Sequence, residues 1–222
     1  MSLPNLPALY PILDAGFLPG DENRGNFLAG LVVGLAEVGV EILQYRNKQG
    51  SDGDILRDAQ TIRAAAPTSL TLILNDYVDL VAEAGFAGIH LGQTDKRPHE
   101  TRALLGPNAV IGISTHNEAQ LTAAALEPVD YIAIGPVFAT ASKEIPDPVV
   151  GIEGVRLARR LTEKPVVAIG GITLENVAKV WKAGADSVAV ISGIFGAKAE
   201  PVRAAAEFLD VFRKQAGSPT LG

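Results

Sequence analysis

The amino-acid sequence predicts an α/β fold, a single-domain (β/α)8 TIM barrel with parallel strands, and three observations carry this prediction. Short β-rich runs alternate about eight times with amphipathic helical patterns, and no long polar linker interrupts the series. The runs are almost continuously apolar, as expected for parallel strands covered on both faces. Polar clusters directly follow most of the runs, at the end of the strands where a barrel carries its active site.

The apolar runs predict eight strands, because they are short and nearly continuously apolar, as expected for buried parallel strands. In chain order they are Leu9–Leu13, Val40–Tyr45, Leu70–Leu74, Gly88–Leu91, Ala109–Ile113, Tyr131–Ile134, Val166–Ile169 and Ser187–Ile191. An open, doubly wound sheet is the alternative. That fold would favour a Gly-x-Gly-x-x-Gly turn after the first strand, and the sequence has none.

Helical spacing of apolar residues predicts a helix after each strand. The expected helices are Gly25–Glu37, Asp52–Ala66, Tyr77–Ala84, His99–Leu105, Asn117–Leu126, Ile152–Leu161, Leu174–Ala183 and Pro201–Lys214. Ser51 followed by Asp54 is a start signal, and Gly39, Gly85 and Gly184 are typical residues for ending a helix.

The length and composition are those of one barrel domain. The chain has 222 residues, within the range of about 200–250 residues that a barrel needs, and 47% of them are hydrophobic. We expect residues 1–215 to form the domain and residues 216–222 to form a flexible C-terminal tail. The longest irregular stretch, Phe138–Val150, is expected to be a mobile lid after the sixth strand.

Charge and composition narrow the functional classes. A net charge of −6 argues against a nucleic-acid partner, although local arginines and lysines still allow a small anionic substrate. No apolar run reaches about 18 residues and no basic, then apolar segment opens the chain, so we expect no membrane partner and a cytoplasmic location. The lack of cysteine excludes disulfides, thiolate nucleophiles and Cys-ligated zinc.

The cluster Gln44-Tyr45-Arg46-Asn47-Lys48 follows the second predicted strand. Alternate side chains of a strand point to the same side, so Gln44, Arg46 and Lys48 share one face. A guanidinium fork beside an ammonium suits a diphosphate. A solvated strand end remains the alternative.

Asn75-Asp76 and Asp95 follow the third and fourth predicted strands, which are neighbours in a barrel. Two carboxylates brought together repel each other unless a cation lies between them, and Mg²⁺ often joins one or two carboxylates to substrate phosphates. Helix capping is the alternative for both acids. The cationic cluster on the preceding strand favours the metal.

Three further clusters offer hydrogen-bond donors to an anion. Thr140, Ser142 and Lys143 lie in the loop after the sixth strand, Gly170-Gly171 follows the seventh, and Ile191-Ser192 ends the eighth. Barrels often bind phosphate on the last two of these loops. A solvated loop and tight turns are the alternatives.

Ser114 follows the fifth predicted strand and can reach the mouth of the barrel. The three histidines, His90, His99 and His116, have no acid–base partner close to them in the sequence. We therefore interpret all three as structural.

In order, the clusters read Gln-x-Arg-x-Lys, Asn-Asp, Gly-Gln-x-Asp, Gly-x-Ser-Thr-His, Gly-Pro-x-Phe-x-Thr-x-x-Lys, Gly-Gly-Ile and Ile-Ser, from Gln44 to Ser192. This ordered set resembles the thiamine phosphate synthase family. The resemblance implies Mg²⁺-dependent transfer of a hydroxymethylpyrimidine group from its diphosphate to thiazole phosphate, with release of diphosphate, in thiamine biosynthesis. The chain departs from the family pattern at Tyr77, where Arg is common, and at Ala139, where Pro is common.

The resemblance also implies roles for individual residues. The pyrimidine diphosphate would be held by Gln44, Arg46, Lys48, Asn75, Ser114 and Lys143, and we include the adjacent Tyr45 and Asn47 among the substrate-binding residues. The thiazole phosphate would be held by Thr140, Ala141, Ser142, Gly171, Ile191 and Ser192. Asp76 and Asp95 would bind Mg²⁺, and Lys143, Ser114, Arg46 and Lys48 would be the catalytic residues.

Two other functions stay open. A thiazole tautomerase is a close relative, but such proteins tend to lose both acids and to carry His where this chain has Pro136. A non-catalytic phosphate-sensing barrel would not need both Asp76 and Asp95. The two acids therefore favour the synthase, and the sequence leaves homo-oligomerisation undecided.

Overall fold

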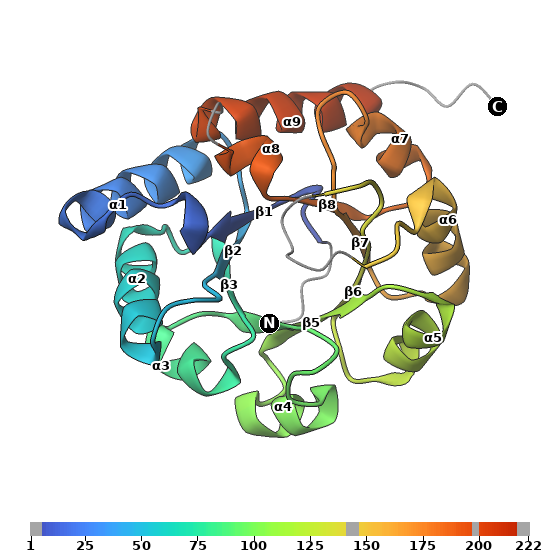
Figure 1. Cartoon of the computed structure of the whole chain (residues 1–222), viewed down its shortest axis with the longest axis horizontal. Helices are drawn as coiled ribbons and strands as arrows, with labels where there is room; N and C mark the ends of the chain where they lie inside the picture. The colour runs from blue at the N-terminus through green and yellow to red at the C-terminus, as the bar shows by residue number, and fades with distance from the viewer. Residues whose placement is uncertain (1–5, 141–146, 197–199, 217–222) are drawn as a thin grey trace.

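The computed structural model of the chain describes residues 6–140, 147–196 and 200–216. Eight parallel strands follow one another around a closed barrel, and the last strand pairs with the first. Helices surround the strands as an outer ring (Figure 1). The predicted fold class is therefore confirmed.

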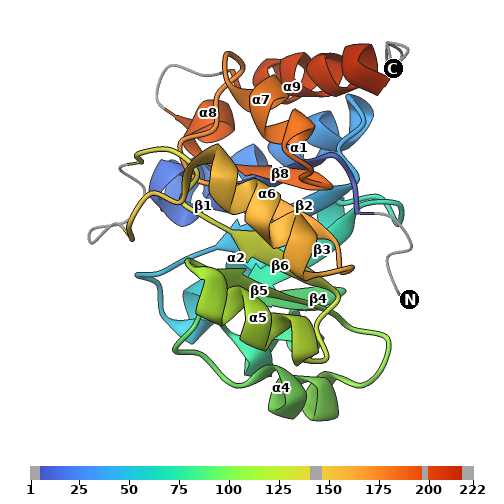
Figure 2. The same cartoon turned by 90° about the vertical axis from the view of Figure 1, so that its right-hand side faces the viewer.

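The strands agree with the predicted runs to within two residues at each end. They are β1 Leu9–Asp14, β2 Ile42–Arg46, β3 Thr71–Asn75, β4 Gly88–Leu91, β5 Val110–Thr115, β6 Tyr131–Ile134, β7 Val166–Ile169 and β8 Ser187–Val190. The helices are α1 Asp21–Glu37, α2 Asp52–Ala65, α3 Val81–Ala84, α4 Pro98–Leu105, α5 Glu118–Leu126, α6 Gly151–Leu161, α7 Val177–Lys182, α8 Ser192–Phe195 and α9 Pro201–Ala216. Helices α9 and α4 lie on opposite sides of the barrel (Figures 1 and 2).

Alternating side chains along each strand enter two separate cores. On β2, Leu43 and Tyr45 pack outward in the large core beneath the helices, whereas Ile42 packs inward with side chains such as Tyr10 and Tyr131. Because both faces are covered, the strands lack the polar alternation of a half-exposed sheet. The same alternation decides which strand-end side chains reach the mouth of the barrel.

The start and stop signals of the helices behave as predicted. Ser51 and Asp54 form a capping box at the start of α2. Gly39, Gly85 and Gly184 follow helices and have positive φ angles, a conformation that glycine adopts without steric cost.

Two of the predicted helices are shorter in the structure by more than one residue. The helix expected over 77–84 is a 3₁₀ turn, Val78–Leu80, followed by the single turn α3, because Asp76 has a positive φ angle and the chain turns tightly there. The helix expected from Leu174 begins at Val177, since the Asn176 side chain accepts the Thr173 N–H at 2.9 Å in a preceding turn. Helix α8 was not predicted, because four residues are too few to show a period.

Helix α1 starts at Asp21, earlier than predicted, and α9 ends at Ala216, one residue into the predicted tail. Residues 217–222 lie outside the described residues, as does the central part of the predicted lid, 141–146. The division into one domain and a tail stays a prediction.

None of the helices in the described ranges is both long enough and apolar enough to cross a membrane.

Gly112 on β5 lies between His90 of β4 and Tyr131 of β6 in the strand register. A Cβ atom at this position would lie 2.0 Å from Cζ of Tyr131, so the absent side chain leaves room for the Tyr131 ring. We expect Gly112→Ala to lower the free energy of unfolding by about 2–3 kcal/mol through overpacking.

The matched control for Gly112→Ala is Gly30→Ala in α1, where an added Cβ meets nothing within 4 Å. This change should raise the free energy of unfolding by about 0.5–1 kcal/mol, because alanine favours the helix over glycine. Urea denaturation of both variants measures the difference. Equal effects at the two positions would show that Tyr131 is free to move.

Candidate functional site

A cavity of about 380 Å³ opens at the C-terminal ends of the strands. Side chains from strand ends or following loops around the barrel line it, as expected for the active-site face of this fold. It brings together eleven of the predicted site residues: Gln44, Arg46, Lys48, Asn75, Asp76, Asp95, Ser114, Thr140, Gly171, Ile191 and Ser192. Residues separated by almost 150 positions in the sequence therefore meet at one site.

The cations of the β2 cluster each contact a carboxylate of a neighbouring strand end. Arg46 forms an ion pair with Asp14, at the end of β1, and Lys48 forms one with Asp76, after β3. Gln44 points inward below them and is almost fully buried. These ion pairs hold both cationic groups at the rim of the cavity. An anionic substrate that binds there would replace the carboxylates as the partner of each cation.

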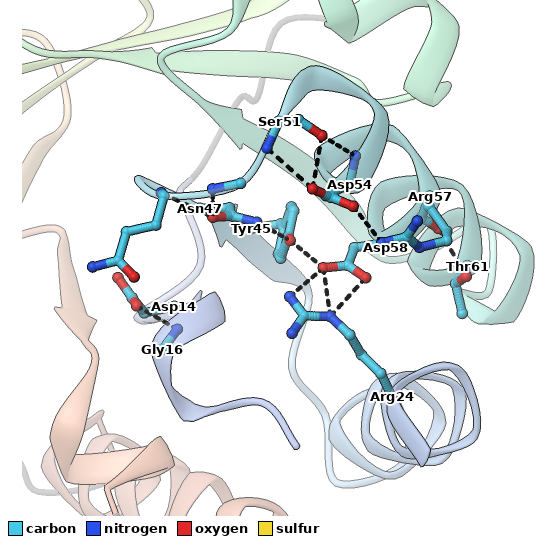
Figure 3. A network of polar contacts seen from close by, with 12 residues as sticks. Asp14, Gly16, Arg24, Tyr45, Asn47, Ser51, Asp54, Arg57, Asp58 and Thr61 are labelled. Atoms are coloured by element: carbon cyan, nitrogen blue, oxygen red, sulfur yellow. Dashed lines mark hydrogen bonds and ion pairs between the residues drawn. The ribbon is translucent and has the colours of Figure 1, made fainter. Parts of the chain in front are cut away.

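Tyr45 and Asn47 do not line the cavity, in contrast to the predicted substrate contacts. Both belong to the opposite side of the alternating β2 segment and point toward α2 (Figure 3). The Tyr45 hydroxyl donates to Asp58, and Asn47 Nδ2 donates to the Tyr45 oxygen at 3.2 Å. Asn47 Oδ1 also accepts the backbone N–H groups of Gln49 and Gly50. Both residues therefore hold the loop after β2 in place from the side that faces α2.

A partly buried ion pair between helices α1 and α2 supports the loop after β2. Arg24 on α1 donates to both carboxylate oxygens of Asp58 on α2, with three contacts of 2.6–2.9 Å (Figure 3). The Asp58 side chain is only 3% exposed. Burial and the neighbouring Asp58 raise the pKa of Tyr45, which keeps its hydroxyl protonated as a donor. The segment with Arg46 and Lys48 is thus anchored on two helices.

Asp76 and Asp95 follow the neighbouring strands β3 and β4, and their carboxyl groups lie close together at the cavity. Burial, reinforced by the neighbouring Asp76 carboxylate, raises the pKa of Asp95. Asp95 also accepts the Gly92 N–H at 2.6 Å, which fixes one of its oxygens. Asp76 has a φ angle of 66°, a left-handed conformation that Asp tolerates better than most residues.

The carboxylate pair fits Mg²⁺. In the parts of the chain that the structure describes, no group of three or more His, Cys or acidic side chains is placed to hold a metal ion. Mg²⁺ commonly uses one or two carboxylates and completes its shell with water and substrate phosphate oxygens. A divalent cation would also offset the repulsion between the two carboxylates, which adds to burial in raising the pKa of Asp95.

Asn75 has a polar side-chain atom without a partner among the described residues. Its Nδ2 is buried and makes no hydrogen bond to any described residue, although the side chain lines the cavity. A buried donor without an acceptor costs about 1–3 kcal/mol. The Asn75 amide is therefore available to donate a hydrogen bond to a bound molecule, and its role in substrate binding stays a prediction.

The loops after β6 and β7 pack against each other at the opposite rim. A Cβ on Gly171 would lie 2.5 Å from the carbonyl oxygen of Ala139, and Gly170 and Gly171 both have positive φ angles. Packing alone therefore requires both glycines. Thr140 lines the cavity, whereas Ala141, Ser142 and Lys143 lie outside the described residues.

Two histidines that we interpreted as structural line the cavity. His90 is an inward-facing residue of β4 and bonds to the Ser114 hydroxyl at 2.8 Å. His116 bonds to the Gly135 carbonyl through Nδ1 at 2.6 Å, and its Nε2 lies 3.6 Å from Asp147. A polar residue inside the short apolar strand β4 was the available signal for His90.

A family model, similar sequences and one of the similar solved structures name the same family. A family model described as thiamine monophosphate synthase matches residues 9–194. A thiamine-phosphate synthase of Koribacter versatilis is 50% identical over 209 residues, 93% of this chain and 96% of that protein. One from Agrobacterium fabrum is 44% identical, covering 77% of this chain and 80% of its own. The solved structure of thiamine phosphate pyrophosphorylase from Pyrococcus furiosus is 28% identical, with a TM-score of 0.81 over 95% of this chain and 97% of that one.

Proposed function

The chain belongs to the thiamine monophosphate synthase family, a family of transferases, and we propose the reaction that it catalyses. It transfers the hydroxymethylpyrimidine group from its diphosphate to the ring nitrogen of thiazole phosphate, and diphosphate is released. The observation that carries this proposal is the meeting of Arg46, Lys48 and the Asp76–Asp95 pair at one cavity. These groups suit a diphosphate accompanied by a divalent cation.

Asp76 and Asp95 would hold Mg²⁺, and the other ligands would come from water and the diphosphate. When bound, Mg²⁺ supplies positive charge that offsets the negative charge developing on the leaving group. The Lys48 ammonium already contacts Asp76, so it lies beside the same phosphate oxygens.

Arg46 and Lys48 stabilise the diphosphate as it leaves, because each places a cation near charge that grows in the transition state. The family resemblance assigns the same role to Lys143. The carbon–oxygen bond to the diphosphate breaks with its electron pair going to oxygen. The electron-rich aminopyrimidine stabilises the resulting cation, and the thiazole nitrogen then donates its lone pair to form the new carbon–nitrogen bond. No proton has to be removed from either substrate. A general base is therefore not required.

The residues at the opposite rim are assigned to the second substrate. Thr140, Gly171, Ile191 and Ser192 line the cavity. The family resemblance adds Ala141 and Ser142, which lie outside the described residues, to the proposed thiazole phosphate site. Hydroxyl and backbone N–H donors suit a phosphate monoester. Two anions can thus bind on opposite sides of one cavity.

The tautomerase alternative is less well supported by the cavity. Both carboxylates face it, and Pro136 lines it at the position where the tautomerase pattern has His. The same pair of acids argues against a barrel that only senses phosphate. A cytoplasmic location stays a prediction, and homo-oligomerisation stays undecided.

The deciding experiment mixes the purified protein with the aminopyrimidine diphosphate, thiazole phosphate and Mg²⁺. We expect thiamine phosphate and diphosphate to form in equal amounts, and both to disappear when EDTA removes the metal. A folded protein that binds thiazole phosphate but forms neither product would favour the tautomerase or the sensing barrel.

A further inference from the structure

A continuous chain of hydrogen bonds crosses the interior of the barrel beneath the cavity. Gln44 Nε2 donates to the Tyr10 hydroxyl at 3.1 Å, and the hydroxyls of Tyr10 and Tyr131 are 2.8 Å apart. The Tyr131 hydroxyl lies 2.9 Å from His90 Nδ1, and His90 Nε2 lies 2.8 Å from Ser114 Oγ. The chain thus joins β2 to β5 through β1, β6 and β4, although β1 and β6 are not neighbours in the barrel (Figure 1).

Both ends of this chain are proposed substrate contacts, and its centre is sealed from solvent. Gln44 and Ser114 line the cavity, whereas Tyr10 and Tyr131 are at most 1% exposed. The ring of His90 stacks on Tyr131 with centroids 5.6 Å apart and planes 20° from parallel, which fixes the imidazole. The two tyrosines therefore influence a bound molecule only through this series of hydrogen bonds.

The number of protons available on these side chains decides which group donates in each hydrogen bond of the series. Burial raises the pKa of Tyr10 and of Tyr131, so each hydroxyl stays neutral and has one proton to donate. Because Tyr10 accepts from Gln44, its own proton goes to the Tyr131 oxygen. The Tyr131 proton then goes to Nδ1 of His90, and a neutral imidazole keeps its proton on Nε2.

We propose that Tyr10, Tyr131 and His90 are positioning residues that turn the Ser114 hydroxyl into a hydrogen-bond donor facing the cavity. His90 Nε2–H donates to Ser114 Oγ, so the Ser114 proton is left to point at an acceptor atom of the bound molecule. This inference rests on the proposed function only for the identity of that molecule, the pyrimidine diphosphate. The opposite direction would make Ser114 donate to His90 and offer only lone pairs to the cavity.

The direction of the chain can be measured without substrate. In ¹⁵N-labelled protein, long-range ¹H–¹⁵N correlation spectra distinguish protonated from unprotonated imidazole nitrogens, and His99→Gln and His116→Gln variants assign the His90 signals. We expect a proton on Nε2 and none on Nδ1. A proton on Nδ1, alone or together with Nε2, would overturn the proposal.

The functional consequence is tested with a double-mutant cycle. Tyr131→Phe removes the hydroxyl in the middle of the chain, and we expect kcat/KM for thiamine phosphate formation to fall about tenfold, the effect of losing a buried hydrogen bond. In a Ser114→Ala background the same change should cost less than about twofold, because the group that it positions is gone. Equal losses in the two backgrounds would mean that Tyr131 acts independently of Ser114.

Thr115→Val is the matched control, since the Thr115 hydroxyl is also buried on a strand and donates to the Ala133 carbonyl at 2.8 Å, outside the chain. It should leave kcat/KM within about twofold and the His90 spectrum unchanged. A wild-type protein without synthase activity would count against the proposed function. The imidazole spectrum of His90 would still show which groups donate in the series of hydrogen bonds. If Tyr131→Phe fails to fold, Tyr10→Phe replaces it, and a loss that persists in the Ser114→Ala background would refute the positioning role.

Discussion

Asp76→Asn is expected to lower kcat/KM for thiamine phosphate formation by at least about 100-fold, because one of the two carboxylates proposed for Mg²⁺ loses its charge. Asn tolerates the left-handed conformation of this position as well as Asp does, so the fold should persist. The Lys48 ammonium also loses its ion-pair partner. Initial rates measured over a Mg²⁺ titration, with calorimetric Mg²⁺ binding as a second readout, check both consequences.

The control for this prediction is Asp79→Asn, the same change three residues later. Asp79 is exposed and pairs with Lys96 outside the cavity. We expect its rates and Mg²⁺ dependence to match the wild type. Asp76→Asn with full activity and an unchanged Mg²⁺ dependence would refute the metal assignment.

Asp58→Ala is expected to lower the free energy of unfolding by about 3 kcal/mol. The change leaves the Arg24 guanidinium and the Tyr45 hydroxyl without their acceptor in a buried place. Because the network anchors the segment that carries Arg46, the KM for the pyrimidine diphosphate should also rise. Urea denaturation and initial rates measure the two effects.

Glu207→Ala on α9 breaks an ion pair at the surface and is the matched control. Its partner Arg203 is 79% exposed, so the loss should be at most about 0.5 kcal/mol. The double change Arg24→Ala and Asp58→Ala should cost less than the sum of the single changes, since the two residues share one interaction. Additive losses would mean that the pair is not the unit that stabilises α1 against α2.

The fold and most of the cavity could be predicted because their signals are local. Apolar runs mark the strands, and a polar residue directly after a run marks the mouth of a barrel, as Asp76 and Ser114 illustrate. The family resemblance rests on the order of these clusters and is confirmed. The rule fails for Tyr45 and Asn47, since the alternation of β2 directs them away from the cavity.

The remaining features depend on contacts between distant residues. Asp58 lies in the middle of a helix, and in the sequence nothing distinguishes it from a solvated surface acid. Its partner Arg24 is 34 residues away and contacts it only in the folded protein. His90 precedes its polar cluster and sits inside a strand, and its partner Tyr131 is 41 residues away. No spacing rule connects such pairs, because only the closed barrel places them together.

The hydrogen bond between the hydroxyls of Tyr10 and Tyr131 joins residues 121 positions apart in the chain. Such a contact forms only after a long loop has been closed, which is entropically costly and tends to come late in folding. A fragment that ends before β6 would leave Tyr10 without this partner. In a split or circularly permuted version of this chain, recovery of synthase activity would therefore report the joining of the two halves of the barrel, and not the folding of either half alone.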